Sequence, residues 1–346
     1  MNAPNTPNAQ TPNRQPPNAP NAPNPPTPFA PKITRGIVAD PERIVIHGAP
    51  GVGKSTLCAD APAPFFLDLE HGTKQLDVDR DDTIDTWEQL LATVRWLITG
   101  EHSFKTLVID TLDRAEWLCW QYVCRTERKS SIESFGFGKG FVAAYEAFRV
   151  LAREMETLRT KRRMRIVLIA HSKIEKVPNP SGEDWERWTL KVDKRVAGLF
   201  YESFDAVLFA RRETFGQKTE TGRTKGIGNK RVVETEESPG WVAKNRYHLP
   251  AQIEMPIEAP WSVLADGLNR GAREVADAIR AELTSAVARL TALDAAAGEA
   301  ARVAAESTPH DAARLSGMLS RVTAGIAMRE AASTDNASPD NANTNA

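Results

Sequence analysis

Residues 43–56 read RIVIHGAPGVGKST, and this stretch constrains the fold more than any other part of the chain. Arg43 to Ile46 is predicted as a short buried strand, and Gly48-x4-Gly53-Lys54-Ser55 fits the complete phosphate-loop pattern. Glycines here let successive backbone N–H groups point inward at a β-phosphate, and a helix that begins near Gly53 adds its positive end. The stretch therefore predicts a nucleoside triphosphate site.

Each residue of this loop has an expected role at the phosphates of ATP. Lys54 can neutralise charge on the β- and γ-phosphates, and the Ser55 hydroxyl is placed to ligate the Mg²⁺ that bridges them. The alternative is a glycine-rich turn that matches by chance, which the strand before it and the helix after it disfavour. The residues expected to bind the nucleotide are Gly48, Ala49, Pro50, Gly51, Val52, Gly53, Lys54, Ser55 and Thr56.

Two later apolar runs end in acidic residues that suit this chemistry. The run from Pro64 ends at Glu70, which can orient or deprotonate the attacking water, although a carboxylate there can also simply cap a turn. The run from Lys105 ends at Asp110, the position of a carboxylate that holds Mg²⁺. Thr111 follows it, which argues against the AAA+ class, because that class places its catalytic carboxylate directly after the aspartate.

Composition bounds what the chain can bind. Lys and Arg number 44 against 45 Asp and Glu, so overall charge predicts no nucleic-acid binding, and such a function needs local patches. The 3 cysteines have no metal-ligand spacing and fit a reducing compartment. No apolar run has the length of a membrane span, and the N-terminus lacks the layout of a signal peptide. We therefore expect a cytoplasmic protein with no membrane partner.

Composition also divides the chain. Residues 1–33, rich in Pro, Asn and Ala, are predicted to be a disordered tail, and residues 34–265 to be the globular core. Residues 266–333 are rich in Ala, with apolar positions every three to four residues, which predicts two or three amphipathic helices. These helices need a partner surface, either the core or a second copy of the chain. Residues 334–346 are predicted to be a second disordered tail.

Two segments of the core are candidates for nucleic-acid contact. After a buried strand that ends at His171, about eighteen residues rich in Pro, Gly and charge are predicted to form a loop that carries Trp185 and Trp188. Either tryptophan can stack on a base of single-stranded DNA or pin the loop to the core. Residues 211–231 carry seven basic and two acidic side chains and are predicted to form a hairpin loop. Its proposed DNA contacts are Arg223, Lys225, Lys230 and Arg231, which can also be a solvated face.

With these residues in place, the stretch from Arg43 to Pro250 resembles the RecA-like ATPase core, and more narrowly the phage-encoded ATP-binding proteins that act in single-strand annealing or recombination. The resemblance implies a doubly wound, mostly parallel α/β sheet in which the strand ending at His171 lies between those ending at Gly48 and Asp110. It implies that Glu70 is the catalytic glutamate and that Asp110 holds Mg²⁺. His171 falls where RecA has a glutamine that senses the γ-phosphate, and the chain departs from RecA there.

The resemblance also implies assembly. Lys244 and Arg246 lie where RecA carries two lysines that reach a neighbouring subunit's nucleotide, so we expect a homo-oligomer, as a ring or a filament. We predict that the two side chains share one face of an edge strand and have no carboxylate partner nearby. The alternative is that they are ordinary edge-strand charges that discourage aggregation.

The resulting hypothesis is an ATPase that binds single-stranded DNA and promotes annealing or strand exchange, with phage or host recombination or replication proteins as possible partners. One alternative is a helicase-related or loader ATPase on the same core. The other is a non-catalytic, nucleotide-dependent scaffold, which an intact Glu70 disfavours.

Overall fold

The computed structural model describes residues 40–179, 182–218, 224–308 and 312–335, and for residues 214–218, 224–229, 271–272, 313 and 333–335 it describes the backbone alone. The predicted tail at residues 1–33 lies outside the described residues, as does nearly all of the one predicted at residues 334–346.

The described core is built on one mixed, mostly parallel sheet with the strand order β10-β8-β7-β1-β5-β4-β2-β3. The central strands β7, β1, β5, β4 and β2 are parallel, whereas β8 and β10 continue the sheet antiparallel. In chain order the strands are β1 (Arg43–Gly48), β2 (Pro64–Asp68), β3 (Asp79–Asp81), β4 (Thr106–Asp110), β5 (Arg165–Val177), β6 (Trp185–Leu190), β7 (Ala206–Lys218), β8 (Thr224–Glu234), β9 (Lys244–Asn245) and β10 (Gln252–Glu254). The predicted placement of the His171 strand between the other two is confirmed.

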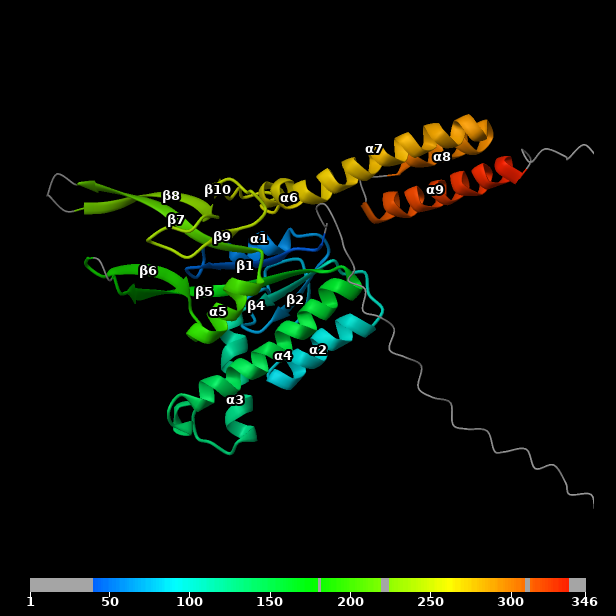
Figure 1. Cartoon of the computed structure of the whole chain (residues 1–346). Coiled ribbons are helices and arrows are strands. Elements are labelled where there is room, and N and C mark those ends of the chain that lie inside the picture. The colour runs from blue at the N-terminus through cyan, green and yellow to red at the C-terminus, as the bar shows by residue number, and fades with distance from the viewer. Residues whose placement is uncertain (1–39, 180–181, 219–223, 309–311, 336–346) are drawn as a thin grey trace, which may run out of the picture. The chain divides into compact units, whose positions relative to one another are not determined.

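Helices cover both faces of this sheet (Figure 1). Four helices contribute buried residues to one face: α2 (Trp87–Thr99), α3 (Leu112–Thr126), α4 (Lys139–Arg162) and α5 (Lys194–Ser203). The other face is packed by α1 (Lys54–Ala59) and α6 (Ser262–Leu268). Residues 125–140 include the end of α3, a short 3-10 turn at Glu133–Phe135 and the start of α4.

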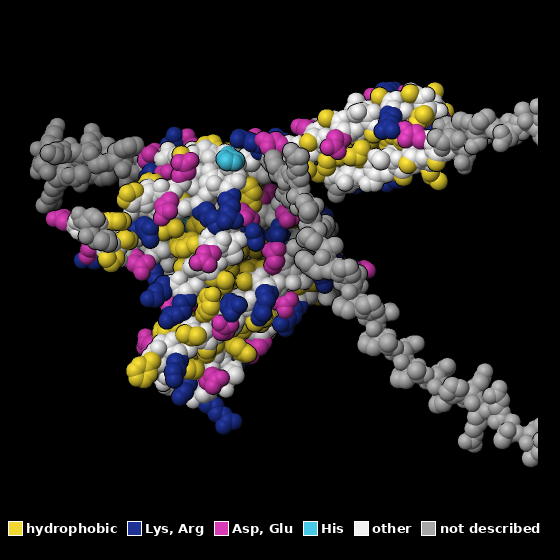
Figure 2. Space-filling model, viewed as in Figure 1, with side chains coloured by type: hydrophobic (Ala, Val, Ile, Leu, Met, Phe, Trp, Pro, Cys, Tyr) yellow, Lys and Arg dark blue, Asp and Glu magenta, His cyan; other side chains and the backbone are white. Residues whose placement is uncertain are grey.

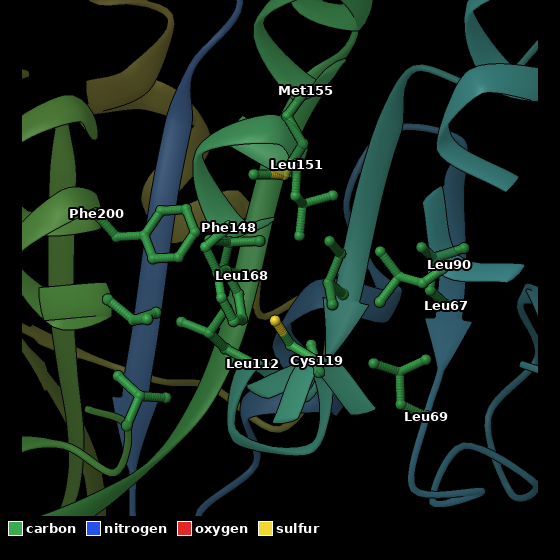
Figure 3. Close-up of a cluster of buried hydrophobic side chains, with 14 of the residues drawn as sticks. Leu67, Leu69, Leu90, Leu112, Cys119, Phe148, Leu151, Met155, Leu168 and Phe200 are labelled. Atoms are coloured by element: carbon green, nitrogen blue, oxygen red, sulfur yellow. The ribbon is translucent and has the colours of Figure 1, made fainter. Parts of the chain in front are cut away.

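The larger core lies between β4, β5 and the helices α3 and α4 (Figure 3). Phe148 of α4 sits at its centre, packing edge-on against Phe200 at a ring-centroid distance of 6.1 Å. Leu168 from β5 and Leu112 and Cys119 from α3 belong to the same cluster, and all are buried. Alternate residues of each strand enter opposite faces, so Leu168 faces these helices while Ile169 faces α1 and α6.

The prediction of a long loop after His171 is wrong. Strand β5 runs on to Val177 and pairs antiparallel with β6, with Val177 opposite Trp185 and Ile174 opposite Trp188. The Pro and Gly residues that indicate a loop gather in the sequence between Val177 and Trp185, whereas the flanking residues pair as strands. Residues 211–231 are likewise mostly strand, because β7 and β8 form a long antiparallel ribbon.

The Ala-rich region forms three helices, α7 (Arg270–Leu293), α8 (Ala295–Ser307) and α9 (Ala312–Asp335), as predicted. Their apolar residues make a cluster of their own, with Leu283 and Leu290 of α7 beside Leu315 and Val322 of α9. Neither of the two expected partners, the core or a second copy, is needed to bury these side chains.

Two tryptophans of α2 offer a test of the core. Trp87 is 1% exposed and packs on Phe148 at 4.9 Å between ring centroids, whereas Trp96 is 46% exposed. We predict that Trp87→Ala lowers the free energy of unfolding by about 3–5 kcal/mol, the usual cost of removing a buried aromatic side chain. Trp96→Ala should cost much less. Urea denaturation measures both, and equal effects would show that burial of Trp87 is not what stabilises this face.

Candidate active site

The phosphate loop joins β1 to α1 and has the backbone that the sequence predicts. Gly51 and Gly53 have φ angles of 72° and 104°, in the left-handed region that side chains other than glycine rarely adopt. Gly53 is the N-cap of α1, which begins at Lys54. Gly48 is required for another reason, because a Cβ there would lie 2.1 Å from the carbonyl oxygen of Ala210 on β7. The loop therefore contains two glycines with left-handed backbone angles and follows a third that is in close contact with a neighbouring strand.

Lys54 lies over this loop and is 6% exposed. Its Nζ donates to the carbonyl oxygens of Gly48 at 2.9 Å and Ala49 at 3.0 Å. Burial lowers the pKa of Lys54, and the nearby carboxylates of Asp110 and Asp113 act in the opposite direction. The ammonium group is thus held at the loop by weak neutral acceptors, which a phosphate oxygen can replace with a stronger, charge-assisted bond.

Ser55 and Asp110 meet at the carboxyl ends of β1 and β4. The Ser55 hydroxyl donates to Oδ2 of Asp110 at 2.6 Å. Burial raises the pKa of Asp110 to about 6, although the Ser55 hydrogen bond lowers it in part. A hydroxyl and a carboxylate are the hard oxygen ligands that Mg²⁺ prefers, and a cation there would also relieve the cost of burying the carboxylate. These two residues fit the predicted metal site.

Glu70 lies in the turn after β2, and its side chain is 37% exposed. Its Oε1 accepts a hydrogen bond of 2.8 Å from the Thr111 hydroxyl, directly after Asp110. Asp68, to which the sequence pattern assigns no role, holds the turn by accepting hydrogen bonds from Gly72 N and from the amide and hydroxyl of Thr73. Glu70 thus has a fixed position beside Asp110 and access to water, as a general base requires.

His171 is held by an aspartate that sequence reasoning missed. Asp113, in the first turn of α3, accepts from the His171 amide at 3.0 Å and from its Nδ1–H at 2.9 Å. This hydrogen bond raises the pKa of His171, while burial acts against it. Oε1 of Glu70 is 3.8 Å from the same Nδ1. One signal was available in the sequence, because Asp113 follows Asp110 by three residues at a predicted strand end.

The site therefore unites a phosphate loop, an Mg²⁺-type pair and a carboxylate–histidine cluster at one edge of a parallel sheet. A family model described as an AAA domain matches residues 40–247, more than half of the chain. The chain belongs to this AAA-domain family. The match covers β1 through β9, including every residue of the site described above.

The AAA-domain match includes Asp110 and Thr111, the two residues on which the sequence argument against the AAA+ class depends. The Thr111 hydroxyl donates to Glu70, which stays the candidate for the catalytic carboxylate. A search of curated proteins found none significantly similar to the chain. Within the described residues, no helix combines the length and apolar character needed to span a membrane.

Lys244 and Arg246 lie at the opposite edge of the AAA domain from the phosphate loop. Asn245 pairs with Ala206, at the start of β7, whereas Gly48 pairs with Ala210 farther along that strand. The prediction that no carboxylate lies nearby is wrong, because Arg246 pairs with Asp205 at 3.2 Å. Lys244 donates to the carbonyls of Tyr201 and Glu202 at the end of α5. Their action on a neighbouring subunit's nucleotide stays a prediction.

Those residues predicted to contact DNA that the structure describes lie on two separate strands, β6 and β8. Trp185 and Trp188 both lie on β6, each 37% exposed. Lys230 is exposed and pairs with Glu254 at 2.6 Å. Arg231 lies against the phosphate loop, because its Nη1 would be 2.7 Å from a Cβ on Gly53. Lys225 lies on β8, and Arg223 lies outside the described residues.

Substitutions at Lys54 and Glu70 should separate binding from hydrolysis. We predict that Lys54→Ala abolishes ATP binding, whereas Glu70→Gln leaves binding intact and slows hydrolysis by ~10² or more, the usual worth of general-base assistance. Calorimetry with a non-hydrolysable analogue and a phosphate-release assay measure the two effects. Equally weakened binding in both variants would remove Glu70 from the catalytic role.

The Asp113–His171 pair should make stability depend on pH. Because the folded-state pKa of His171 is raised, its contribution is present below the ordinary value of 6.5 and is lost as the pH rises through the raised value. Asp113 must be ionised as well, so the unfolding free energy of the native chain should exceed that of Asp113→Asn most between pH ~4 and ~6.5.

Denaturation at several pH values measures this difference. In a His171→Gln background, Asp113→Asn should have an effect that no longer varies between pH 5 and 8. A pH dependence that persists there would assign the effect to another group.

Proposed function

We propose that the chain is an ATPase that binds single-stranded DNA and couples ATP hydrolysis to annealing or strand exchange. The ATPase part rests on the site and on the family. The DNA part is supported by one observation above the others, the contact between the basic β7–β8 ribbon and the phosphate loop.

This contact joins a predicted DNA-binding element to the nucleotide site. Arg212 of β7 donates to the carbonyl oxygen of Gly51 at 3.1 Å. From β8, Arg231 packs over Gly53 and donates to the carbonyl of Pro256 at 3.1 Å. Both arginines belong to the ribbon that holds seven basic and two acidic residues between positions 211 and 231. A strand of DNA bound along the ribbon would therefore act on residues that touch the phosphate loop.

The face of the described core seen in Figure 2 is mixed in charge, whereas the sequence of the ribbon is predominantly basic. On the face seen in Figure 2, Lys and Arg side chains alternate with Asp and Glu over the core. Such a surface gives no extended positive field to attract a polyanion. A net charge of −1 for the whole chain is consistent with binding through one local element.

The chain's own residues account for the hydrolytic part of the proposal. Lys54 and the N–H groups of the loop would bind the phosphates, and Ser55 and Asp110 would hold Mg²⁺, which supplies positive charge to the phosphate oxygens when bound. Glu70 would take a proton from the attacking water. His171, fixed by Asp113 at 2.9 Å, would place its imidazole ring beside Glu70, in the position of the γ-phosphate sensor.

The experiment measures ATP turnover with and without single-stranded DNA, over a series of salt concentrations. We expect DNA to stimulate turnover. We also expect Arg223→Gln with Lys225→Gln to flatten the dependence of log affinity on log salt by ~0.7 for each phosphate that the variant no longer neutralises. The matched control is Arg149→Gln with Arg153→Gln, which removes the same charge from two exposed positions of α4.

Turnover unaffected by DNA, with unchanged salt dependence in the ribbon variant, would contradict the DNA-binding part and leave an ATPase of another purpose. Strand-annealing, unwinding and loading assays on the active protein then separate the proposed role from the helicase-related and loader alternatives.

A further inference from the structure

A pocket of about 420 Å³ lies between the β5–β6 hairpin, β7 and the segment before β9. Its walls include three aromatic side chains, Trp188, Phe209 and Trp241, together with Ile174, Arg187 and Arg211. Of these six, Trp188 is the one that the sequence marks individually as a candidate DNA contact. The lining of the pocket comes from β5, β6, β7 and the segment before β9, which are far apart in the chain.

The three rings lie nearly parallel, with Phe209 between the two tryptophans. The Trp188 and Phe209 rings are 6.1 Å apart between centroids with an interplanar angle of 26°, and Phe209 and Trp241 are 5.8 Å apart at 24°. Phe209 is 3% exposed, whereas Trp188 is 37% exposed. A buried aromatic floor with a partly exposed tryptophan wall offers flat apolar surface on which another planar ring can stack.

Backbone hydrogen bonds hold this pocket open before any ligand arrives. The Trp188 amide donates to the carbonyl of Gly240 at 2.9 Å, and the Val242 amide donates to the carbonyl of Trp188 at 3.0 Å. The walls are thus fixed to each other, so binding of a ligand requires little further ordering.

The rim of the pocket is nearly neutral. Arg211 pairs with Glu234 at 2.6 Å and lies 5.4 Å over the Trp241 ring, and Arg187 pairs with Glu237 at 3.2 Å. Because both cations already have carboxylate partners, the pocket is a poor phosphate site. It suits an uncharged planar ring that is attached to charged groups lying outside the pocket. Strand β7 carries Phe209 and Arg211 and continues into the basic ribbon.

We propose that this pocket accepts one unstacked base of single-stranded DNA, while the β7–β8 ribbon contacts the phosphates. The inference rests on the proposed DNA-binding function and specifies its site. It assigns stacking to Trp188 and not to Trp185, since Trp185 lies on the same strand with equal exposure but takes no part in lining the pocket.

The pocket also borders the nucleotide site. The Phe209 ring lies 5.0 Å from the ring of His47, the residue before Gly48. Burial lowers the pKa of His47 to about 4, so the ring is neutral. Because a carbonyl can only accept, Nε2–H donates to Val242 O, and Nδ1 then accepts from the Ser172 hydroxyl, both at 2.8 Å. A base stacked in the pocket would thus be linked through Phe209 to His47 and Ser172, which are next to Gly48 and His171 in the sequence.

The test compares two oligonucleotides of equal length, one of thymidylate and one of abasic residues, by fluorescence anisotropy on the full chain. The native chain should bind thymidylate more tightly by roughly 5- to 100-fold, the range expected for stacking of one base. Trp188→Ala should remove this preference and leave affinity for the abasic strand unchanged. Trp185→Ala should keep the preference, and Trp188→Phe should restore most of it.

The outcomes separate the two proposals. Binding of neither oligonucleotide would overturn the proposed function itself. Equal binding of both by the native chain, or an equally reduced preference in Trp185→Ala and Trp188→Ala, would overturn the pocket while leaving DNA binding through the ribbon in place. If a peptide of residues 1–33 abolished the tighter binding of thymidylate, the pocket proposal would be overturned too, because the Pro-rich segment would then be the occupant.

Discussion

The pairing of β1 between β5 and β7 is the constraint on which the rest of the site depends. In this register Gly48 stands opposite His171 on one side and Ala210 on the other. The contact with Ala210 is so close that a Cβ on Gly48 would lie 2.1 Å from its carbonyl oxygen. A shift of one residue would turn Ile44 and Ile46 from the α1 face to the opposite face, so burial of the sheet on both sides holds the register.

This register concentrates opposite charges where the parallel strands end. Lys54 and His171 lie among the carboxylates of Glu70, Asp110 and Asp113, and negative charge from this group acts to raise the pKa values of Lys54, Asp110 and His171. The pKa values of the two aspartates shift in opposite directions. Burial dominates at Asp110 and raises its pKa to about 6, whereas burial at Asp113 is outweighed by the hydrogen bonds from His171, which lower its pKa. Asp110 therefore gains most from a metal ion, and Asp113 is already satisfied by the protein.

The same strands that end at the nucleotide site continue beyond it as two antiparallel hairpins. Strand β5 passes His171 and turns back as β6, and β7 passes Ala210 and turns back as β8. In each hairpin one strand is also a strand of the parallel sheet. Displacement of either hairpin by a ligand would therefore act on β5, which carries His171, or on β7, which pairs with Gly48. In the proposed function, this shared backbone is the physical route between DNA and ATP.

The sequence by itself determined those features that depend on neighbours in the chain. The glycines of the phosphate loop, the acidic residues Glu70 and Asp110 after apolar runs and the helical character of the Ala-rich region follow from local pattern. The place of the His171 strand between the strands that end at Gly48 and Asp110 was instead implied by the resemblance to RecA.

Only the tertiary structure decided the contacts between distant segments, because strand register and side-chain direction set them. Asp113 beside His171, Arg231 over Gly53 and the carboxylate partner of Arg246 are of this kind. So is the aromatic pocket, in which β6, β7 and the segment before β9 each supply one ring. Alternation along a Pro- and Gly-containing stretch gives no signal of its pairing partner, which is why the local pattern predicts loops where β5 pairs with β6 and β7 pairs with β8.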